Sequence, residues 1–141
     1  MKFFTKKEVV FYEKPGCAGN KKQKELLTSN GVEFEVKSML DTKWSVESLN
    51  SFFKDLDKEK IVNQFAPQVK SGEIDISKLS KDELVNLMIK EPILIKRPLI
   101  QVDDEKICGF DIPKLNSALS LDLDSKKEIG TCQSSDSCKT V

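Results

Sequence analysis

A short apolar run, a tight turn and a cysteine in direct succession constrain the fold of this chain most. Residues 9–12 are β-branched or aromatic and predict a buried strand. Residues 13–16 predict a turn, and a helical pattern begins at Cys17. The start of a helix favours a thiolate over a thiol, because its N–H groups carry partial positive charge. Cys17 is therefore a candidate nucleophile, and Lys21 and Lys22 add positive charge nearby.

The composition excludes several classes of site. The chain has no histidine, which rules out a Cys-His nucleophile and any metal site that needs imidazole. Its 23 basic residues balance 23 acidic ones, so charge gives no argument for binding nucleic acid or an anionic membrane. No apolar run approaches the ~20 residues of a membrane-spanning helix, and the N-terminal sequence does not resemble a signal peptide. We therefore expect a cytoplasmic protein that does not bind membranes.

The four cysteines are then expected to be free, catalytic or redox-sensing, because thiols stay reduced in the cytoplasm. Cys108 lies in an apolar stretch, which favours packing over chemistry. Cys132 and Cys138 lie in a Ser-rich segment, and four interpretations stay open. They could resolve an intermediate on Cys17, form a disulfide with each other, supply half of a metal site, or have no role. Two thiolates without further ligands are a weak metal signal, so no metal is predicted.

The length of 141 residues predicts one domain. Residues 29–31 (SNG) signal the end of the first helix, and the alternation in residues 32–36 predicts a second strand with one buried face. A strand, helix and strand connected this closely predict a right-handed βαβ unit with parallel strands. We expect a folded domain over residues 1–120, a helical insertion at about 43–92, and a flexible tail over 121–141.

Further signals define the insertion and the C-terminal part of the domain. Ser45 is a predicted N-cap, and a short helix centred on residues 61–65 is expected to stop before Pro67. Ser80 and Glu83 predict a capping box. An antiparallel hairpin and a final helix are predicted at residues 99–102, 106–110 and 112–119. The order βαβ–helical insertion–ββα predicts an α/β fold with one four-stranded mixed sheet.

This order of elements, with a cysteine at the first strand-to-helix turn and a proline before the hairpin, resembles the thioredoxin fold. Two motifs, GCAGNKKQKELL and EPILIKRPLI, resemble those of the ArsC/Spx-like family, which contains glutaredoxin-coupled arsenate reductases and their relatives. The second is similar to that family's P-I-L-I-x-R-P-I/L pattern. The runs IVNQFAPQVKSGEID and MIKEPILIKRPLIQV, with a cysteine-bearing tail, look most like the nitrogenase-associated proteins of the family. The resemblance covers about residues 9–110.

The resemblance implies that Cys17 is the nucleophile and that Arg97, the only arginine in the sequence, binds an oxyanion or a partner thiol near it. A guanidinium group suits this role, because it offers a fork of donors that lysine cannot copy. Pro98 would be a cis-proline facing the thiol. The other residues expected at the site are, for binding the oxyanion, Asn20, Lys21 and Lys22, and, as a structural residue, Gly16.

The sequence also departs from the family's patterns. Arsenate reductases of this type use three arginines, and the other two would fall near residues 63–64 and near Lys106, where no arginine is present. The Spx-type redox switch needs a second cysteine three residues after the first, and Asn20 occupies that place. These departures argue against arsenate reduction and exclude a local Cys-x-x-Cys switch.

Two functions of different classes are therefore expected. The first is a thiol-based oxidoreductase that uses Cys17 and no bound cofactor, with glutathione as a co-substrate or glutaredoxin as a partner. The second is a non-catalytic thioredoxin-like adaptor or regulator that binds a protein partner, such as a nitrogenase-related component. By analogy with the family, we expect a monomer.

Overall fold

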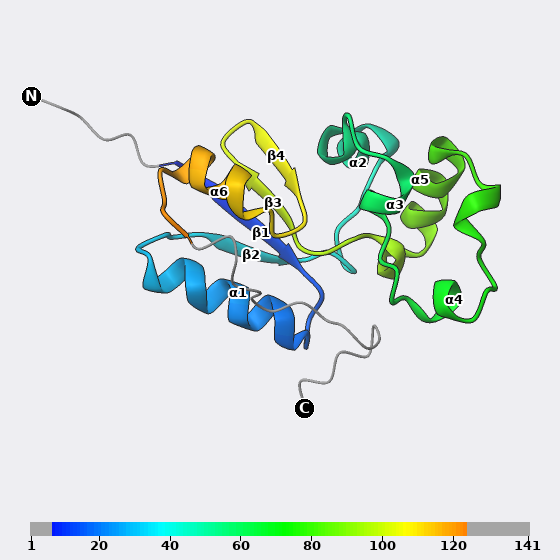
Figure 1. Ribbon diagram of the computed structural model, residues 1–141, viewed down its shortest axis with the longest axis horizontal. Coiled ribbons are helices and arrows are strands. Elements are labelled where there is room, and N and C mark those ends of the chain that lie inside the picture. The colour runs from blue at the N-terminus through cyan, green and yellow to red at the C-terminus, as the bar shows by residue number, and fades with distance from the viewer. Residues whose placement is uncertain (1–6, 124–141) are drawn as a thin grey trace, which may run out of the picture.

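The computed structural model describes residues 7–123, and every structural statement below concerns this part of the chain. Its helices and strands follow one another in the order that the sequence predicts (Figure 1). They are β1 (Val9–Glu13), α1 (Ala18–Ser29), β2 (Glu35–Ser38), α2 (Val46–Phe53), α3 (Lys58–Ile61), α4 (Pro67–Lys70), the 3₁₀ turn η1 (Ile76–Lys78), α5 (Lys81–Lys90), the 3₁₀ turn η2 (Pro92–Leu94), β3 (Leu99–Val102), β4 (Glu105–Cys108) and α6 (Ile112–Leu119).

The four strands form one mixed sheet in the order β2-β1-β3-β4. β1 runs parallel to β2 and antiparallel to β3, with Phe11 opposite Val36 on one side and Ile100 on the other. β3 and β4 form the predicted hairpin, in which Asp103 and Asp104 make the turn. This arrangement confirms the predicted α/β class and the four-stranded mixed sheet.

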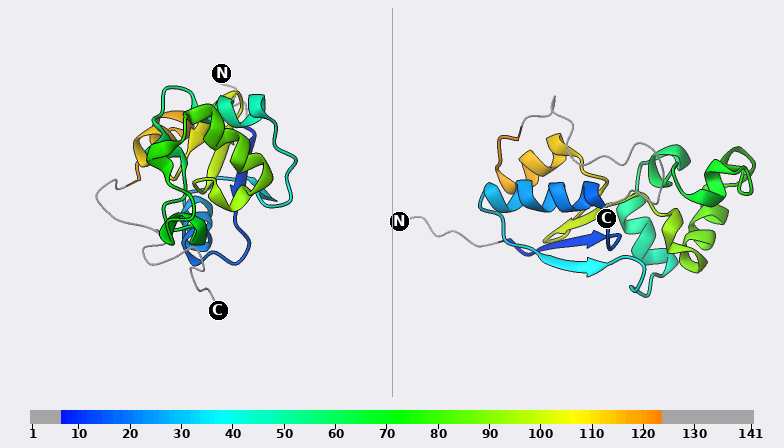
Figure 2. Two further views of the ribbon diagram at one scale, coloured as in Figure 1. Left: turned by 90° about the vertical axis from the view of Figure 1, so that its right-hand side faces the viewer. Right: turned by 90° about the horizontal axis from the view of Figure 1, so that it is seen from below.

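The two faces of the sheet are covered differently. Figure 2 shows α1 and α6 together on one face, while the helices of the insertion gather beyond one end of the sheet. The core beneath α1 and α6 contains Phe11, Leu27, Ile100 and Leu115, and each of these side chains is fully buried. Burial of apolar surface is the main driving force here, at about 25 cal/mol per Å².

A second core lies inside the insertion and reaches the sheet. Its buried residues include Leu49, Phe53, Leu84 and Met88 from α2 and α5. On the sheet side, Leu99 belongs to it, and other sheet side chains are packed against it, namely those of Tyr12 and Cys108. The insertion is therefore joined to the sheet by packed side chains as well as by the backbone.

Local sequence signals explain where several helices begin. The Ser80 hydroxyl accepts from the Glu83 backbone N–H at 3.0 Å, and the Glu83 carboxylate accepts from the Ser80 N–H at 2.8 Å, which confirms the predicted capping box of α5. Ser45 caps α2, as predicted. The Asp111 carboxylate caps α6 by accepting from the Lys114 N–H at 3.2 Å.

The second strand differs from its predicted range. It begins at Glu35, because the preceding residues complete the end of α1. Gly31, at φ +80°, donates its N–H to Thr28, and Val32 donates its N–H to Leu27, both at 3.0 Å. The alternating apolar residues therefore reflect packing beneath α1, and the expectation of a strand with a buried face over residues 32–36 was wrong: Glu35, Val36 and Lys37 are exposed.

The short helix predicted around residues 61–65 also differs. α3 ends at Ile61, and Val62 leaves the helix to form an isolated antiparallel bridge with Ile95. Pro67 does not stop a helix but opens α4, where a missing N–H costs nothing. Among the helices of the described chain, none is long and apolar enough to cross a membrane.

Candidate functional site

The turn between β1 and α1 fixes the position of Cys17. The Cys17 N–H donates to the Lys14 carbonyl at 3.1 Å, and Gly16 has φ +83°. Pro15 precedes this glycine, and a proline followed by a positive-φ glycine is typical of a type II turn. Cys17 itself is the N-cap of α1, as the sequence predicts, although its side chain makes no capping hydrogen bond.

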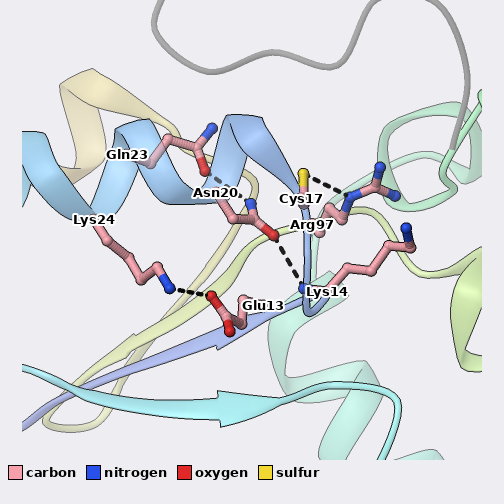
Figure 3. Close-up of polar contacts among 7 residues, drawn as sticks. All are labelled: Glu13, Lys14, Cys17, Asn20, Gln23, Lys24 and Arg97. Carbon is pink, nitrogen blue, oxygen red and sulfur yellow. Dashed lines mark hydrogen bonds and ion pairs between the residues drawn. The ribbon is translucent and has the colours of Figure 1, made fainter. Parts of the chain in front are cut away.

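Asn20 holds this turn against the first turn of α1. Its side chain is 2% exposed, and its Oδ1 accepts from the Lys14 backbone N–H at 3.0 Å. Its Nδ2 donates to Gln23 Oε1 at 2.9 Å, so both ends of the amide are engaged within the turn and helix (Figure 3). The sequence placed Asn20 among oxyanion-binding residues, whereas the observed contacts give it a structural role beside the cysteine.

Arg97 approaches the sulfur of Cys17 from the opposite side of the site. Its Nε donates to Cys17 Sγ at 3.5 Å, across a sequence separation of 80 residues (Figure 3). The peptide bond between Arg97 and Pro98 is cis. The carbonyl of Pro98 accepts from the Gly109 N–H at 2.7 Å, which ties this segment to the end of the hairpin.

The insertion positions Arg97. The segment that leads from the insertion to β3 is held by backbone hydrogen bonds to the end of α3 and to the residues that follow it. The Lys96 N–H donates to the Ile61 carbonyl at 2.9 Å, and the Asn63 N–H donates to the Leu94 carbonyl at 2.8 Å. Cys17 therefore comes from the sheet half of the domain, and Arg97 comes from the segment that leaves the insertion.

The charges around Cys17 differ in how close they lie. The thiol is buried, with 4% exposed, and Arg97 is half-buried. Lys21 and Lys22 are exposed on α1, whereas Lys24 forms an ion pair with Glu13. The guanidinium of Arg97 is in contact with the sulfur. Because the site is partly desolvated, one charge in contact acts more strongly than solvated lysines further away.

Sequence reasoning missed two contributors to the site. Lys14 supplies the backbone groups that fix the turn, and its side chain extends to the same side of the site as Arg97 (Figure 3). Gln23 supports Asn20 from the next turn of α1. A polar residue spaced three positions from a helix-start asparagine was the available signal for Gln23, whereas a lysine in a turn is normally only a solvated charge.

The residues near the two expected arginine positions, Asn63 and Lys106, make other contacts. Asn63 is 7% exposed, and its Oδ1 accepts from the Phe65 N–H at 3.0 Å, so its side chain stabilises the loop after α3. The ammonium group of Lys106 lies 5.6 Å from the centre of the Phe52 ring and 3.4 Å from Ser51 Oγ. Both of these contacts of Lys106 are with α2.

Cys108 is packed against the insertion, as predicted. Its Sγ lies 3.7 Å from the Lys60 carbonyl, and burial raises the pKa of the thiol to about 12. Cys132 and Cys138 lie outside the described residues. Within residues 7–123, no group of three or more potential metal ligands is found.

The sheet order, the cysteine at the start of α1 and the Arg97-Pro98 segment beside it define a thioredoxin-like thiol domain with a helical insertion. The ArsC family model matches residues 12–116, and the chain belongs to the ArsC family.

Relatives of this chain include proteins of different kinds. A protein of Rhodospirillum rubrum, described as an uncharacterized 15.7 kDa protein in the draG 3′ region, is 38% identical over 127 residues, covering 90% of this chain and 89% of that protein. The global transcriptional regulator Spx of Streptococcus pyogenes is 26% identical over 116 residues, covering 81% and 87%. The structure of an arsenate reductase from Vibrio cholerae has a TM-score of 0.65 and 25% identity, covering 82% of this chain and 98% of that one.

Proposed function

We propose that this protein is a thiol-dependent reductase in which the Cys17 thiolate attacks an electron-poor oxygen or sulfur atom of an oxidised substrate. The observation that carries the proposal is the contact of 3.5 Å between Arg97 Nε and Cys17 Sγ. It pairs a nucleophile at a helix start with a cation that is half-buried beside it. Hydrogen bonds from charged donors are about twice as strong as neutral ones, and they stabilise the thiolate rather than the thiol.

Arg97 would serve two purposes in this reaction. Its Nε supports the thiolate before attack, and the remaining N–H groups of the guanidinium form a fork that suits an oxyanion or a carboxylate. Lys21 and Lys22, exposed on the first turns of α1, would attract an anionic substrate from solution without holding it. Pro98 and Gly16 would shape the backbone on the two sides of the sulfur.

The residues present favour a hydroperoxide or a mixed disulfide over arsenate as the substrate. Asn63 and Lys106, near the places where arsenate reductases of the family carry arginines, are engaged with the loop after α3 and with α2. One guanidinium can steady one oxygen or a carboxylate, whereas a trianionic transition state needs more positive charge. Glutathione is the proposed co-substrate that returns Cys17 to the thiol, delivered directly or through glutaredoxin, and no bound cofactor is required.

Alkylation of Cys17 tests this proposal. Iodoacetamide reacts with thiolates, so the rate at Cys17 at about pH 7, identified by peptide mapping, reports how strongly the site favours the thiolate in the wild-type protein. A charge-assisted bond is worth ~1.5–3 kcal/mol, so Arg97→Gln should slow alkylation ~10- to 100-fold at that pH. Arg97→Lys should restore only part of the rate, because lysine keeps the charge and loses the fork.

Lys106→Gln is the matched control, because it removes the same charge from a residue that contacts α2. Its alkylation profile should match that of the wild-type protein. If Arg97→Gln and the wild-type protein give the same dependence of rate on pH, the guanidinium does not activate Cys17 and the proposal fails.

A second candidate function is a regulator that binds a protein partner through the same domain. It is favoured by the structural engagement of Asn63 and by the relatives named Spx, which are global transcriptional regulators. Under this alternative, Cys17→Ser should leave binding of the partner unchanged. Calorimetric titration of the wild-type protein and of Cys17→Ser with glutaredoxin is a first measurement. A reductase needs the Cys17 thiol to form a covalent complex with glutaredoxin, whereas an adaptor does not.

A further inference from the structure

We propose that Lys14 selects the substrate of the site by binding a carboxylate that lies close to the disulfide bond attacked by Cys17. The substrates would then be anionic disulfides, that is, disulfides whose substituents carry carboxylates. This inference rests on the proposed function, because it needs a Cys17 that reacts with an oxidised sulfur atom. It adds to that function a second cation, whose task differs from that of Arg97.

The backbone of Lys14 is fixed close to the nucleophile. Its N–H donates to Asn20 Oδ1 at 3.0 Å, and its carbonyl accepts from the Cys17 N–H at 3.1 Å. The two ends of such a four-residue turn lie within ~7 Å of each other, measured between Cα atoms. The Lys14 side chain therefore starts beside Cys17, and its four-carbon stem is long enough to reach a group bound to the sulfur.

The side chain of Lys14 extends to the same side of the site as that of Arg97 (Figure 3). Both residues are half-buried, whereas Lys21 and Lys22 on α1 are exposed. Partly buried charges act more strongly on a ligand than solvated ones, because the effective dielectric constant around them is lower. A substrate that approaches Cys17 from this side would therefore meet two effective cations.

The two segments that carry these cations contain no acidic residue. Residues 14–24 include four lysines, and residues 92–102 include Lys96 and Arg97, but neither range contains an aspartate or a glutamate. Glu13, directly before the first range, forms an ion pair with Lys24. Over the whole chain, 23 basic residues balance 23 acidic ones. The segments around Cys17 are therefore a local concentration of positive charge, which favours an anionic substrate.

The two cations would have different tasks. Arg97 Nε donates to Cys17 Sγ at 3.5 Å, so the guanidinium acts on the reacting sulfur itself. Lys14 offers a point charge with three N–H donors on a flexible stem, which suits a carboxylate whose position varies from one substrate to another. Hydrogen peroxide carries no such group. The substituents of a disulfide extend beyond the reacting sulfur atoms and can carry one, so an anionic disulfide is the substrate that would use both cations.

The reaction balances without an external oxidant. The Cys17 thiolate attacks one sulfur of the disulfide, a new S–S bond forms, and the old S–S bond breaks. The leaving sulfur departs with the electron pair of the broken bond and takes up a proton from water. Cys17 is thereby oxidised to a mixed disulfide, and the leaving sulfur is reduced to a thiol. Lys14 takes no part in these bond changes and binds the carboxylate while they occur.

The test measures second-order rate constants for mixed-disulfide formation at Cys17, identified by non-reducing peptide mapping of the full-length protein. The two probes are oxidised glutathione, which is anionic, and bis(2-hydroxyethyl) disulfide, which is neutral. The charge preference is the ratio of the two rate constants, divided by the same ratio for a short cysteine peptide. Any change in the thiolate fraction of Cys17 cancels in this ratio. The charge preference of the wild-type protein should be ~3- to 10-fold, somewhat more than an exposed ion pair provides.

Lys14→Met should remove most of this preference, because it keeps the stem and loses the ammonium, and it should leave the rate with the neutral probe within ~2-fold of the wild-type rate. Lys14→Arg keeps the charge and should keep the preference. Lys90→Met is the matched control, because it removes an exposed lysine at the end of α5 and should leave the preference unchanged. Raising the ionic strength from ~0.01 M to ~1 M should lower the preference of the wild-type protein more than that of Lys14→Met, since salt screens charges.

The same preference in Lys14→Met as in the wild-type protein would overturn the proposal, as would an equal loss in Lys90→Met. If Lys14→Met does not fold, as judged by circular dichroism, Lys14→Gln replaces it with the same expected loss. A wild-type protein without charge preference, or one whose Cys17 is alkylated by iodoacetamide but reacts with neither probe, would overturn the proposal and leave thiol chemistry with other substrates standing. A Cys17 that reacts with neither probe and is not alkylated would instead refute the proposed function.

Discussion

Cys108 occupies the last position of β4, and its thiol faces the helical insertion rather than the site. Burial raises its pKa to about 12, while the nearby ammonium groups of Lys96 and Lys114 act in the opposite direction. Desolvation disfavours the thiolate here. Cys17, by contrast, lies against the Arg97 guanidinium. The two cysteines show how one fold can pack one thiol against apolar side chains and place another against a charged side chain.

The raised pKa of Cys108 predicts a dependence of stability on pH. In the unfolded chain this thiol ionises above about pH 8.5, whereas in the folded chain it stays protonated up to about pH 12. Folding therefore gains from the neutral thiol at lower pH, and that gain is lost as the pH rises between these two values. The free energy of unfolding of the wild-type protein should fall more steeply in this range than that of Cys108→Ala.

Urea titrations at about pH 8 and about pH 10 measure this difference. The comparison between the two proteins removes the contribution of the lysines, which titrate in both. If the free energy of unfolding of Cys108→Ala falls with pH as steeply as that of the wild-type protein, the folded state favours the neutral thiol no more than water does.

Asn20 gives a second prediction at this scale. Replacing it with alanine leaves the Lys14 N–H without the acceptor that holds the turn, and leaves Gln23 without its donor. Loss of a buried hydrogen-bond partner costs ~1–3 kcal/mol, so Asn20→Ala should lower the free energy of unfolding by that amount. Asn86→Ala, at an exposed position on α5, is the control and should change it by less than ~0.5 kcal/mol. Equal effects of both changes would mean that Asn20 does not stabilise the turn.

Sequence reasoning reached the chemistry of single residues only in part. Cys17 and its place at the helix start follow from local signals, because a strand, a turn and a helix are all short-range features. The contact between Cys17 and Arg97 joins residues 80 positions apart, and only the motif around Arg97 suggested it. The hydrogen bonds of Asn20 to Lys14 and Gln23 could not be predicted, because the same amide can bind a ligand or the backbone and composition does not distinguish the two.

At the scale of elements, capping residues were the most reliable signals. Ser80 and Glu83 form their capping box as the sequence predicts, since both hydrogen bonds are local. Ser80→Ala removes the hydroxyl that accepts from the Glu83 N–H, and should lower the free energy of unfolding by ~1 kcal/mol. Chemical denaturation followed by circular dichroism measures this change.

Ser117→Ala provides the comparison for Ser80→Ala, because Ser117 is exposed within α6 and alanine is a better helix former. It should leave the stability unchanged within ~0.5 kcal/mol. If both substitutions lowered the free energy of unfolding equally, the loss at Ser80 would be a general effect of replacing serine, and the capping hydrogen bond would not stabilise the protein.

Two elements were misjudged because apolar periodicity has more than one cause. The alternation at residues 32–36 comes from side chains packed beneath α1, and the strand itself starts at Glu35. In residues 61–65, Ile61 and Val62 are buried, while the backbone leaves the helix at Val62 to pair with Ile95. Pairing over such a distance leaves no local pattern in the sequence, so neither boundary could be predicted from it.

At the scale of the whole molecule, three aromatic rings join the sheet to the insertion. The ring of Tyr12 on β1 lies 5.0 Å from that of Trp44 and 5.9 Å from that of Phe52, measured between centroids. Rings at these distances attract one another beyond the area that they bury. They are the place where the core of the insertion meets the sheet, so they should make the two parts unfold together.

Tyr12→Ala should weaken that coupling and destabilise the protein by about 3 kcal/mol, the lower end for loss of a large aromatic side chain. Trp44 is the only tryptophan and belongs to the core of the insertion, so its fluorescence reports on that core and on its junction with β1. In the variant, the fluorescence transition should occur at lower denaturant concentration than the circular dichroism transition, whereas the two should coincide in the wild-type protein. Tyr12→Phe keeps the ring and should keep the transitions together; a split in this control would place the coupling elsewhere.

The divided origin of the site has a consequence for damaged molecules. Cys17 is carried by the sheet half, and Arg97 by the segment that the insertion holds in place. If heat or a lesion frees the insertion while the sheet persists, the guanidinium leaves the sulfur, and under the proposed function the cysteine loses the charge that activates it. Reactivity would then be confined to intact copies, and a partly unfolded copy would be spared cross-linking to its neighbours.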